Sequence, residues 1–308
     1  MNQKVSNEIT LHICVPTFKE NDLAINFINC LKKSVYKNWI LYMVNAFPKD
    51  NLKVKVSNQF KGLKDKIIFI NGEESEFWSE SVNRGLRKIK GNNKPHDKLI
   101  IANVDNSFSN ELLSNLVNNH KSNMQLACVS INKEKKIIKT GIKVKSWFFA
   151  INQHLMLSKN IQEIEKKIVK ADFLPVSLVI FPIEVVNKNI FIDSKYLPHY
   201  GGDYAYSIFL KSKGYLPFVD FSSVVENNEL NTGYCTYRTK ITLYNRLKNI
   251  LSIKNQSSIR NRFWLVMRYY PIYSRPTAFL SYLIKTLIET FLGGGKISYL
   301  KNFLRRKL

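Results

Sequence analysis

Hydrophobic and polar positions follow a regular order over the first 130 residues of the chain. Short apolar runs alternate with longer stretches in which apolar residues recur at helical spacing. Such an order is typical of a mostly parallel sheet covered by helices, the α/β class. The predicted strands are 11–15, 40–44, 66–70, 99–102 and 126–131, and the predicted helices are 22–33, 79–90 and 110–120.

A polar residue closes or follows each of the first four predicted strands. These residues are Thr17, Asn45, Asn71 and Asp105. The carboxyl ends of parallel strands meet at one edge of a sheet, and open α/β sheets bind their ligands at that edge. We therefore expect a binding crevice there, although a structural turn would explain any one of the four on its own.

The middle of the chain predicts three further elements. They are a hairpin over 136–147 with its turn near Gly141, a buried strand over 172–181 that Pro175 and Ser177 interrupt, and a pair of strands within 216–225. We expect the interrupted strand, with Ser177, to line a pocket.

The segment 198–204 places one carboxylate beside two glycines and two tyrosines. A helical pattern begins at Asp203 and ends at Gly214, so Asp203 lies in its first turn, where the helix dipole favours the ionised carboxylate. Glycines allow a ligand to approach the backbone, and aromatic side chains suit a sugar ring. The segment favours a transferase site, and the alternative is an N-cap aspartate after a tight turn.

Composition indicates a folded protein with a large core. The chain has 308 residues, of which 45% are hydrophobic and 12% aromatic, and this length corresponds to one or two domains. Residues 1–10 contain no apolar run of signal-peptide length, which predicts a protein of the cytosol, peripheral on the cytoplasmic face of the membrane. We expect reduced thiols, because no metal or redox spacing relates Cys14, Cys30, Cys128 and Cys235.

Several motifs of other enzyme classes are missing from the sequence. No glycine-rich dinucleotide loop follows the first strand, and the run 293–297 lacks the Ser or Thr that follows lysine in a P-loop. We interpret the glycines of that run as a helix stop. The histidines form no metal-spaced pair and no nucleophile motif is found, which argues against hydrolases and dehydrogenases.

Positive charge is concentrated near the C-terminus. The formal net charge is +24, and residues 231–308 contain fifteen basic residues but one acid, Glu289, interleaved with aromatic residues. Such a composition suits an anionic lipid surface or a nucleic acid. We therefore divide the chain into an α/β domain over 1–235 and a basic amphipathic helical region over 236–308.

A helix is predicted from Arg275 to Leu292, with Ser281, Lys285 and Glu289 as its narrow polar stripe. It is too short and too charged for a membrane span, so we expect it to lie in the membrane interface. The alternative is an ordinary helix docked on the α/β domain. Nucleic-acid binding is a further alternative, but the basic residues lie outside the predicted site and no RNA or DNA module signature is present.

Five segments occur in an order that resembles a known family. They are 15–18, 34–45, Phe77-Trp78 with Asn83-Arg84-Gly85, 103–106 (Asn-Val-Asp-Asn), and 191–214. In this order they resemble the nucleotide loop, the second helix-strand unit, the Trp and Asn-x-Gly segment near the donor nucleotide, the Asp-x-Asp type motif and the acceptor-side segment of glycosyltransferase family 2. The chain resembles in particular the bacterial polysaccharide and rhamnosyltransferase-like members, over residues 10–235.

The resemblance implies a GT-A fold, a Rossmann-like and mostly parallel sheet with flanking helices. It implies inverting transfer of a sugar from a nucleotide-sugar donor to a saccharide or lipid-linked saccharide in cell-surface polysaccharide synthesis. Asp203 would be the catalytic base, and Asp105 would bind Mg²⁺ or Mn²⁺. The implied donor-binding residues are Pro16, Thr17, Asn45, Trp78, Asn83, Arg84 and Asp105, and the acceptor-side residues are Ser177, His199 and Tyr200.

Two positions depart from the family pattern. An aspartate is usual where Asn45 stands, and a second carboxylate is frequent where Val104 stands, which leaves Asp105 as the one acidic candidate ligand of that motif. A single carboxylate together with diphosphate oxygens is compatible with a magnesium site. A catalytically silent sugar-binding relative is the alternative that these departures permit.

Overall fold

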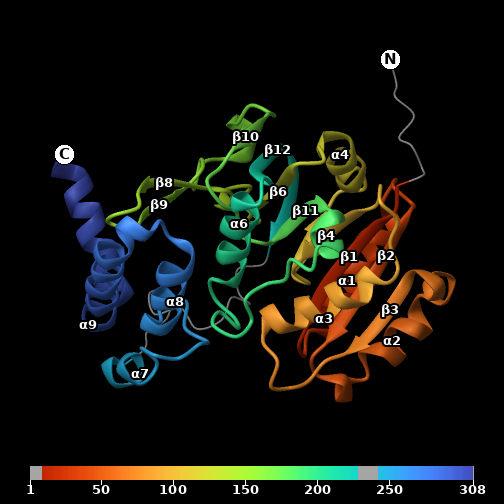
Figure 1. Cartoon of the computed structure of the whole chain (residues 1–308), viewed down its shortest axis with the longest axis horizontal. Coiled ribbons are helices and arrows are strands. Elements are labelled where there is room, and N and C mark those ends of the chain that lie inside the picture. Colours follow the sequence, from red (N-terminus) through yellow and green to blue (C-terminus); the bar gives the residue numbers. More distant parts are fainter. Residues whose placement is uncertain (1–8, 228–241, 308) are drawn as a thin grey trace.

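The structure, a computed structural model, describes residues 9–227 and 242–307 of the chain (Figure 1). The strands are β1 (Leu11–Thr17), β2 (Trp39–Asn45), β3 (Ile67–Asn71), β4 (Lys98–Ala102), β5 (Asn106–Phe108), β6 (Met124–Ile131), β7 (Ile137–Lys139), β8 (Ile142–Ser146), β9 (Ile151–His154), β10 (Ile168–Lys170), β11 (Leu178–Pro182) and β12 (Leu216–Asn227). The helices are α1 (Asn21–Lys33), α2 (Leu52–Gln59), α3 (Trp78–Lys90), α4 (Leu112–Asn119), α5 (Glu184–Asn187), α6 (Gly202–Ser212), α7 (Leu243–Lys248), α8 (Ile259–Tyr269) and α9 (Arg275–Lys307).

A single ten-stranded sheet organises the molecule, in the order β10-β12-β6-β11-β4-β1-β2-β3, with β5 paired to β12 and β7 paired to β6. Strands β3, β2, β1 and β4 are parallel neighbours, β11 runs antiparallel between β4 and β6, and β12 is parallel to β6. This mostly parallel sheet confirms the predicted α/β class. The hydrophobic pattern did not predict α2, of which only Leu52 and Val56 are buried.

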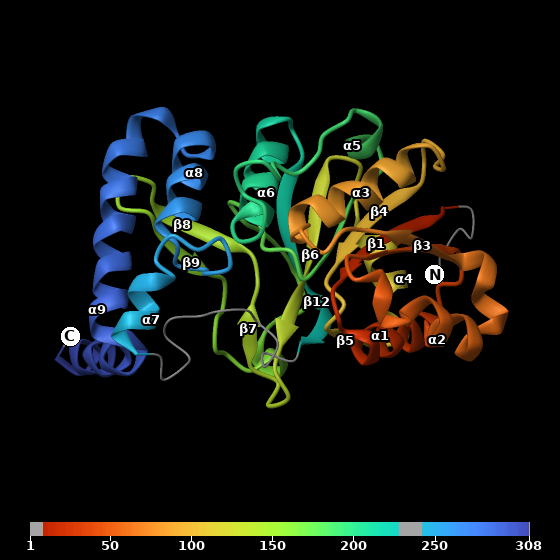
Figure 2. The same cartoon turned by 90° about the horizontal axis from the view of Figure 1, so that it is seen from below.

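Helices cover both faces of the sheet, and β1 shows how its side chains divide between them. Leu11, Ile13 and Val15 pack in the cluster that includes α1 and α4, whereas Cys14 packs in the cluster that includes α3. Figure 2 shows α3, α5 and α6 on one side of the sheet and α1 and α2 on the other. Gly85 lets α3 approach closely, because a Cβ there would come within 2.3 Å of the Cys14 sulfur.

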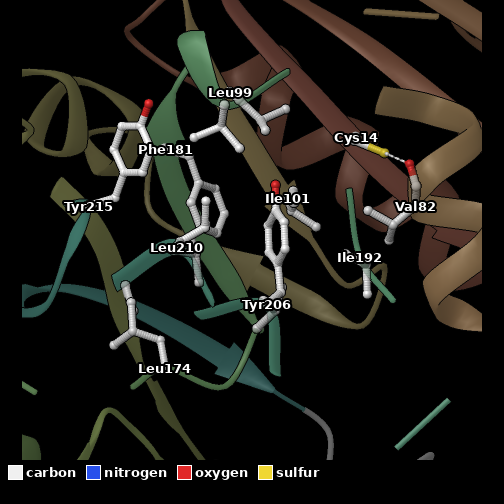
Figure 3. Packing of buried hydrophobic residues seen from close by; sticks show 14 of the residues in the cluster. Cys14, Val82, Leu99, Ile101, Leu174, Phe181, Ile192, Tyr206, Leu210 and Tyr215 are labelled. Carbon is white, nitrogen blue, oxygen red and sulfur yellow. Dashed lines mark hydrogen bonds between the residues drawn. The ribbon is translucent and has the colours of Figure 1, made fainter. Parts of the chain in front are cut away.

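Helix α6 is fixed on the same face by packing and by buried hydrogen bonds. Tyr206 packs against Phe181 of β11, with ring centroids 5.8 Å apart (Figure 3), and its hydroxyl donates to the Ile190 carbonyl at 3.0 Å. The Ser207 hydroxyl donates to Gln125 Oε1 at 2.7 Å. Because a buried polar group left unpaired is costly, these bonds hold α6 in one position on the sheet.

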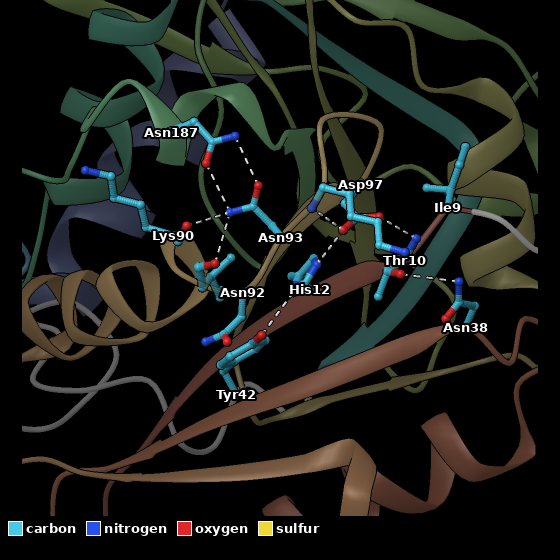
Figure 4. Close-up of polar contacts among 12 residues, drawn as sticks. Ile9, Thr10, His12, Asn38, Tyr42, Lys90, Asn92, Asn93, Asp97 and Asn187 are labelled. Atoms are coloured by element: carbon cyan, nitrogen blue, oxygen red, sulfur yellow. Dashed lines mark hydrogen bonds and ion pairs between the residues drawn. The ribbon is translucent and has the colours of Figure 1, made fainter.

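A buried polar network lies at the amino ends of the parallel strands, where β1 and β4 begin (Figure 4). The two ring nitrogens of His12 lie 3.0 Å from Asp97 Oδ2 and 3.1 Å from the Tyr42 hydroxyl. Asp97 also accepts hydrogen bonds from the N–H groups of Thr10 and Lys94. Burial alone would raise the pKa of Asp97, but these hydrogen bonds outweigh it and lower that pKa. We assign this network a structural role, since it lies away from the carboxyl ends of the strands.

The C-terminal helices share a core with the α/β part of the molecule. A third hydrophobic cluster joins Ala205 of α6, Leu265 and Val266 of α8, and Ala278 of α9. Figures 1 and 2 show α8 between α6 and α9. None of the helices in the described ranges has the length and apolar character that a membrane span requires. The predicted boundary between 235 and 236 lies outside the described residues.

The cysteines of the described ranges are free. Cys14 and Cys128 are buried and Cys30 is partly buried, which agrees with the predicted thiols. Burial raises the pKa of the Cys14 thiol to about 12, so this thiol is inert at neutral pH. Cys235 lies outside the described residues.

The predicted hairpin over 136–147 is wrong. Strand β7 pairs with β6, where Ser130 lies opposite Lys139, and β8 pairs with β9. Gly141, between β7 and β8, occupies a crowded position, since a Cβ there would lie 2.4 Å from the Val219 side chain. The glycine therefore allows a close passage of the chain rather than an exposed turn.

The strand predicted over 172–181 begins only at Leu178. The backbone N–H groups of Leu174 and Val176 bond to the side chains of Ser207 and Asp203, respectively, so they are not available to a strand ladder. This part of the chain is tied to α6 instead.

Two predictions near the C-terminal end of the chain are also wrong. The strand pair within 216–225 is the single strand β12, which pairs with β6, β10 and β5. The glycines at 293–295 do not stop α9, which continues to Lys307. Glycine disfavours a helix by about 1 kcal/mol per residue without forbidding it.

Candidate active site

The carboxyl edge of the sheet brings the predicted strand-end residues together. Thr17 lies opposite Asn45 in the pairing of β1 with β2, and Asn45 lies opposite Asn71 in the pairing of β2 with β3. Asp105 follows β4, the neighbour of β1 on its other side. Pro16 lies opposite Val44, one position before Thr17. The hydroxyl of Thr17 is buried and has no hydrogen-bond partner among the described residues, so it is available to a ligand.

Asn45 is buried and organises the turn after β2. Its Nδ2 donates to Asp50 Oδ1 at 2.9 Å, and its Oδ1 accepts from the Phe47 N–H at 2.9 Å. The other carboxylate oxygen of Asp50 is buried and lacks a partner within the described part of the chain. Sequence reasoning missed Asp50, which places a carboxylate beside the position where the family usually has one.

An aromatic pair borders the same edge and was also missed. The rings of Phe18 and Phe47 meet edge-on with centroids 5.9 Å apart, and the Lys19 amine lies 4.2 Å from the Phe47 centroid. Phe18 keeps 45% of its surface exposed. These rings follow β1 and β2 directly and offer an apolar face on which a nucleobase can stack.

Trp78, at the start of α3, holds the loop that carries Asp105. Its indole N–H donates to Asn103 Oδ1 at 3.0 Å, and the Asn103 N–H donates to the Ser177 carbonyl at 2.8 Å. The Ser177 hydroxyl is buried without a partner in the described ranges. Trp78 and Ser177 are therefore linked through Asn103, two residues before Asp105.

Asp105 is largely enclosed, and burial raises the pKa of its carboxyl, against the lowering effects of the Lys139 charge and a hydrogen bond from Asn227. Its Oδ1 is buried and has no partner among the residues described. The pKa of Glu20 is raised by burial and by the charge of Asp105, so Glu20 is a neighbouring carboxylate that the sequence analysis missed. Val104 is only 4% exposed and packs in the core, so this position directs its side chain away from a ligand.

Asp203 lies in the first turn of α6, and Gly201, with φ of 85°, is the N-cap. The carboxylate accepts from the Tyr204 N–H at 2.9 Å and from the Val176 N–H at 3.2 Å, so it bridges α6 and the segment before β11. Burial raises the pKa of Asp203, while Lys139 and these two N–H groups lower it. The helix is therefore capped by glycine and not by the aspartate.

Two glycines and α3 shape the backbone around Asp203. A Cβ at Gly202 would come within 2.4 Å of the Ser79 hydroxyl, so α3 and α6 begin side by side. The Ser79 hydroxyl donates to the Leu197 carbonyl at 2.6 Å. Because Ser79 follows Trp78, the start of α3 connects Trp78 to the segment that leads into α6.

His199 and Tyr200, the predicted acceptor-side residues, form an aromatic group with Phe77. The His199 ring lies 4.5 Å from the Tyr200 ring and 5.8 Å from the Phe77 ring, measured between centroids. Burial, and then the charge of Lys254 from the C-terminal region, lower the pKa of His199 to about 4. The imidazole is therefore neutral at physiological pH, and its Nδ1 is buried without a partner in the described residues.

Lys139 is a further residue that the sequence did not single out. It ends β7, and its charge lowers the pKa of both Asp105 and Asp203. The charge of one lysine thus acts on both Asp105 and Asp203. The wrong hairpin prediction concealed this residue, because it paired β7 with β8 instead of β6.

Asn83 and Arg84, two further predicted donor residues, also have internal partners. The side-chain amide of Asn83 donates to the Ile192 carbonyl and accepts from the Ile192 N–H, both at 2.8 Å. Arg84 forms ion pairs with Glu76 and Glu73 of the loop before α3. In this structure Asn83 ties α3 to the acceptor segment, and Arg84 braces the loop that leads into α3.

Comparison with known protein families identifies the chain. A model described as glycosyl transferase family 2 matches residues 12–186, which is more than half of the sequence. The chain belongs to glycosyl transferase family 2. The matched range of this glycosyltransferase contains Thr17, Asn45, Trp78 and Asp105 and ends before Asp203. No curated protein sequence matches it.

Solved structures similar to this glycosyltransferase are GT-A enzymes. The mannosyltransferase PcManGT from Pyrobaculum calidifontis, in complex with GDP-Man and Mn2+, aligns with a TM-score of 0.55 at 12% identity over 88% of this chain and 68% of that one. GalNAc-T7, with UDP, GalNAc and Mn2+, aligns with a TM-score of 0.57 at 12% identity over 88% of this chain, which spans 53% of the length of GalNAc-T7. TarS 1–349 of S. aureus aligns with a TM-score of 0.52 at 11% identity, over 89% of this chain and 71% of that one. These likenesses show the GT-A fold.

The residues of this glycosyltransferase fit a single-carboxylate cation site. The described residues contain no group of three His, Cys, Asp or Glu side chains that could enclose a metal on their own. The unpartnered Asp105 Oδ1 nevertheless provides one anionic oxygen at the sheet edge. Mg²⁺ is commonly bound by one or two carboxylates together with substrate phosphates and water, so Asp105 with a donor diphosphate meets that requirement.

Proposed function

We propose that this glycosyltransferase moves a sugar, with inversion, from a nucleotide-sugar donor to a hydroxyl of a saccharide or lipid-linked saccharide. The observation that carries the proposal is the placement of Asp203. Its carboxylate lies at the start of α6, keeps part of its surface exposed, and is oriented by the N–H groups of Val176 and Tyr204. A base must be ionised and within hydrogen-bond reach of the attacking hydroxyl.

Asp203 would accept the acceptor's hydroxyl proton as the acceptor oxygen bonds to the anomeric carbon. The bond from that carbon to the donor diphosphate breaks in the same displacement, and the nucleoside diphosphate leaves with the bonding electrons. Burial raises the pKa of Asp203, which makes the carboxylate a better proton acceptor than an exposed aspartate. Trp78, His199 and Tyr200 shape the space on the sugar and acceptor sides.

Charge that develops on the departing diphosphate requires compensation. A divalent cation, Mg²⁺ or Mn²⁺, would be held by Asp105 and would supply Lewis-acid stabilisation of the diphosphate. Lys139, whose charge reaches Asp105, would supply a positive charge that does not depend on metal. Lys139 would thus compensate part of the diphosphate charge at a site where Val104, an apolar residue, supplies no second carboxylate for the cation.

The nucleotide would bind at the ends of β1 and β2. Thr17 offers an unpartnered hydroxyl there, and Asp50, oriented by Asn45, offers a carboxylate oxygen to the base or ribose. Phe18 and Phe47 provide the aromatic faces. Asn45 therefore contributes to nucleotide binding by positioning Asp50.

The acceptor is expected on the side of the C-terminal region, in cell-surface polysaccharide synthesis at the cytoplasmic face of the membrane. The support is that α8 packs on α6, the helix of Asp203, and that Lys254 influences His199. The basic character of this region suits an acceptor carried on an anionic lipid.

The proposal is tested by incubating the protein with a panel of UDP-, GDP- and dTDP-sugars, with saccharide and lipid-linked acceptors, and following nucleoside diphosphate release with and without EDTA. One donor should give acceptor-dependent release, and EDTA should reduce it. Asp105→Asn should lose the EDTA effect, whereas Asp65→Asn, an exposed aspartate away from the site, should keep it. Nucleotide binding without release from any donor would support the silent sugar-binding relative instead.

A further inference from the structure

Helix α9 carries its large hydrophobic residues on the outside. Its exposed stripe consists of Leu280, Ile284, Leu287, Ile288 and Phe291, each at least 38% exposed, and we call this set the outer apolar stripe. The buried face of the same helix consists of Ala278, Tyr282, Thr286, Glu289 and Thr290. A helix that merely docks on a domain shows the opposite arrangement, with its apolar residues inward.

A buried ion pair sets this orientation. Arg262 of α8 lies 3.1 Å from Glu289 and donates to Thr286 of α9, and its side chain is 10% exposed. The Thr286 hydroxyl in turn donates to the Ser257 carbonyl. A buried guanidinium must be paired and hydrogen-bonded. Because α9 satisfies Arg262 with its polar residues, its leucines and isoleucines are directed away from α8. Of the predicted polar stripe, Glu289 is buried, whereas Lys285 is exposed.

Helix α7 exposes further hydrophobic side chains in the same region. It packs against α9 and exposes Leu243, Tyr244 and Leu247, with Tyr244 73% exposed. Soluble monomeric proteins rarely expose large contiguous apolar surfaces, and such surfaces mark sites of interaction with proteins or membranes.

The charge around this surface has one sign. Residues 242–292 contain eight basic residues and one acid, Glu289, which is buried against Arg262. The described surface of this region therefore presents cations and no carboxylate. The sequence of 293–307 adds five basic residues and no acid. A hydrophobic stripe within a cationic surface is complementary to an anionic lipid leaflet, in which apolar acyl chains lie below negatively charged head groups.

We propose that the outer apolar stripe of α9 docks on the surface of a membrane leaflet that contains anionic lipids, while the buried face of the helix stays on α8. The apolar side chains would enter the boundary between head groups and acyl chains, and the surrounding lysines and arginines would contact the lipid phosphates. Since α8 also packs on α6, docking would hold the Asp203 side of the molecule near the leaflet.

Two other occupants fit the surface less well. A second copy of the chain would bring two cationic regions together, which opposes association. A nucleic acid would satisfy the charge but would leave the outer apolar stripe uncovered.

Vesicle co-sedimentation of the full chain tests the proposal. Binding does not require a sugar donor, so it succeeds or fails independently of glycosyl transfer. The protein should bind vesicles of phosphatidylcholine with phosphatidylglycerol and should bind pure phosphatidylcholine vesicles much more weakly. Ile284→Glu/Ile288→Glu, at side chains 50% and 46% exposed, should weaken binding by at least about tenfold.

A matched control separates the stripe from net charge. Val35→Glu/Val54→Glu introduces the same two charges at side chains 62% and 58% exposed, and α2 lies at the far end of the molecule from α9 (Figure 1). This control should keep most of the vesicle binding, and both doubles should retain the circular dichroism spectrum and melting temperature of the wild type.

Three results would overturn the proposal. Equal loss of binding in the two doubles, or none in either, would exclude the stripe as the contact. If the wild type forms a dimer and does not bind vesicles, and the Ile284→Glu/Ile288→Glu variant is a monomer, the surface is the contact with a second copy of the chain. Salt-dependent binding to an oligonucleotide with no binding to vesicles would assign the region to nucleic acid.

Discussion

Removing the Glu289 carboxylate should destabilise the C-terminal region strongly. Glu289→Leu leaves Arg262 buried at an interface where its side chain is 10% exposed, with hydrogen bonds only to Thr286 and to the Tyr282 carbonyl. Breaking a buried ion pair by removal of one partner costs about 3–5 kcal/mol, because the remaining charge is desolvated and unpaired. We expect a loss of about 3 kcal/mol, since the two remaining hydrogen bonds offset part of that cost.

The companion variant removes both charges. In Arg262→Met/Glu289→Leu no charge remains to be desolvated, and the apolar replacements fill a similar volume. Replacement of a buried pair by hydrophobic residues is often neutral or stabilising, so the double variant should lie within about 1 kcal/mol of the wild type. The coupling between the two positions would then be about 2 kcal/mol or more.

Urea unfolding followed by circular dichroism measures both variants and the single variant Arg262→Met, which the double-mutant cycle requires. Glu163→Leu, at an exposed glutamate between β9 and β10, is the control and should change stability by less than about 0.5 kcal/mol. If Glu289→Leu costs less than about 1 kcal/mol, or if the two changes are additive, the ion pair does not fix α9. The outward orientation of the apolar stripe would then need another cause.

Three further outcomes are expected at the site. Burial raises the pKa of Asp203, so the transfer rate should fall as the pH decreases through a value above the ordinary pKa range of aspartate. A pH–rate profile in which the rate falls only within that ordinary range would contradict this. Lys139→Met should reduce kcat by about 10²-fold and move that acid limb to higher pH, since the Lys139 charge lowers the pKa of Asp203; an unchanged limb would exclude Lys139 from the site. Asp50→Asn should weaken nucleotide binding by about tenfold with kcat retained, as calorimetry and steady-state kinetics can show, whereas equal affinity would remove Asp50 from the nucleotide site.

The α/β core was predictable because its local signals agree with its topology. Each apolar run of the first 131 residues became a strand, with ends within two residues of the prediction, because runs buried on both faces read as continuous hydrophobic segments. Thr17, Asn45 and Asn71 came together because parallel strands in register place their ends at one edge.

What failed depended on contacts between residues far apart in sequence. The hairpin over 136–147 was missed because β7 bonds to β6 and Gly141 lies against Val219. The burial of Glu289 could not be predicted from the α9 pattern alone, because its partner Arg262 lies on another helix. Side-chain roles at the site were hidden for the same reason, since the link between Asn83 and Ile192 spans 109 positions.

In the proposed mechanism the Asp203 carboxylate is the base of glycosyl transfer. The most direct measurement is the single-turnover rate of transfer from the donor that the wild type uses, for Asp203→Asn and for the control Asp65→Asn, together with the dissociation constant of the nucleoside diphosphate. We predict that Asp203→Asn lowers the rate by about 10²–10⁴-fold while nucleotide affinity and melting temperature stay near the wild type. A rate for Asp203→Asn within a few-fold of the wild type would exclude Asp203 as the base of glycosyl transfer.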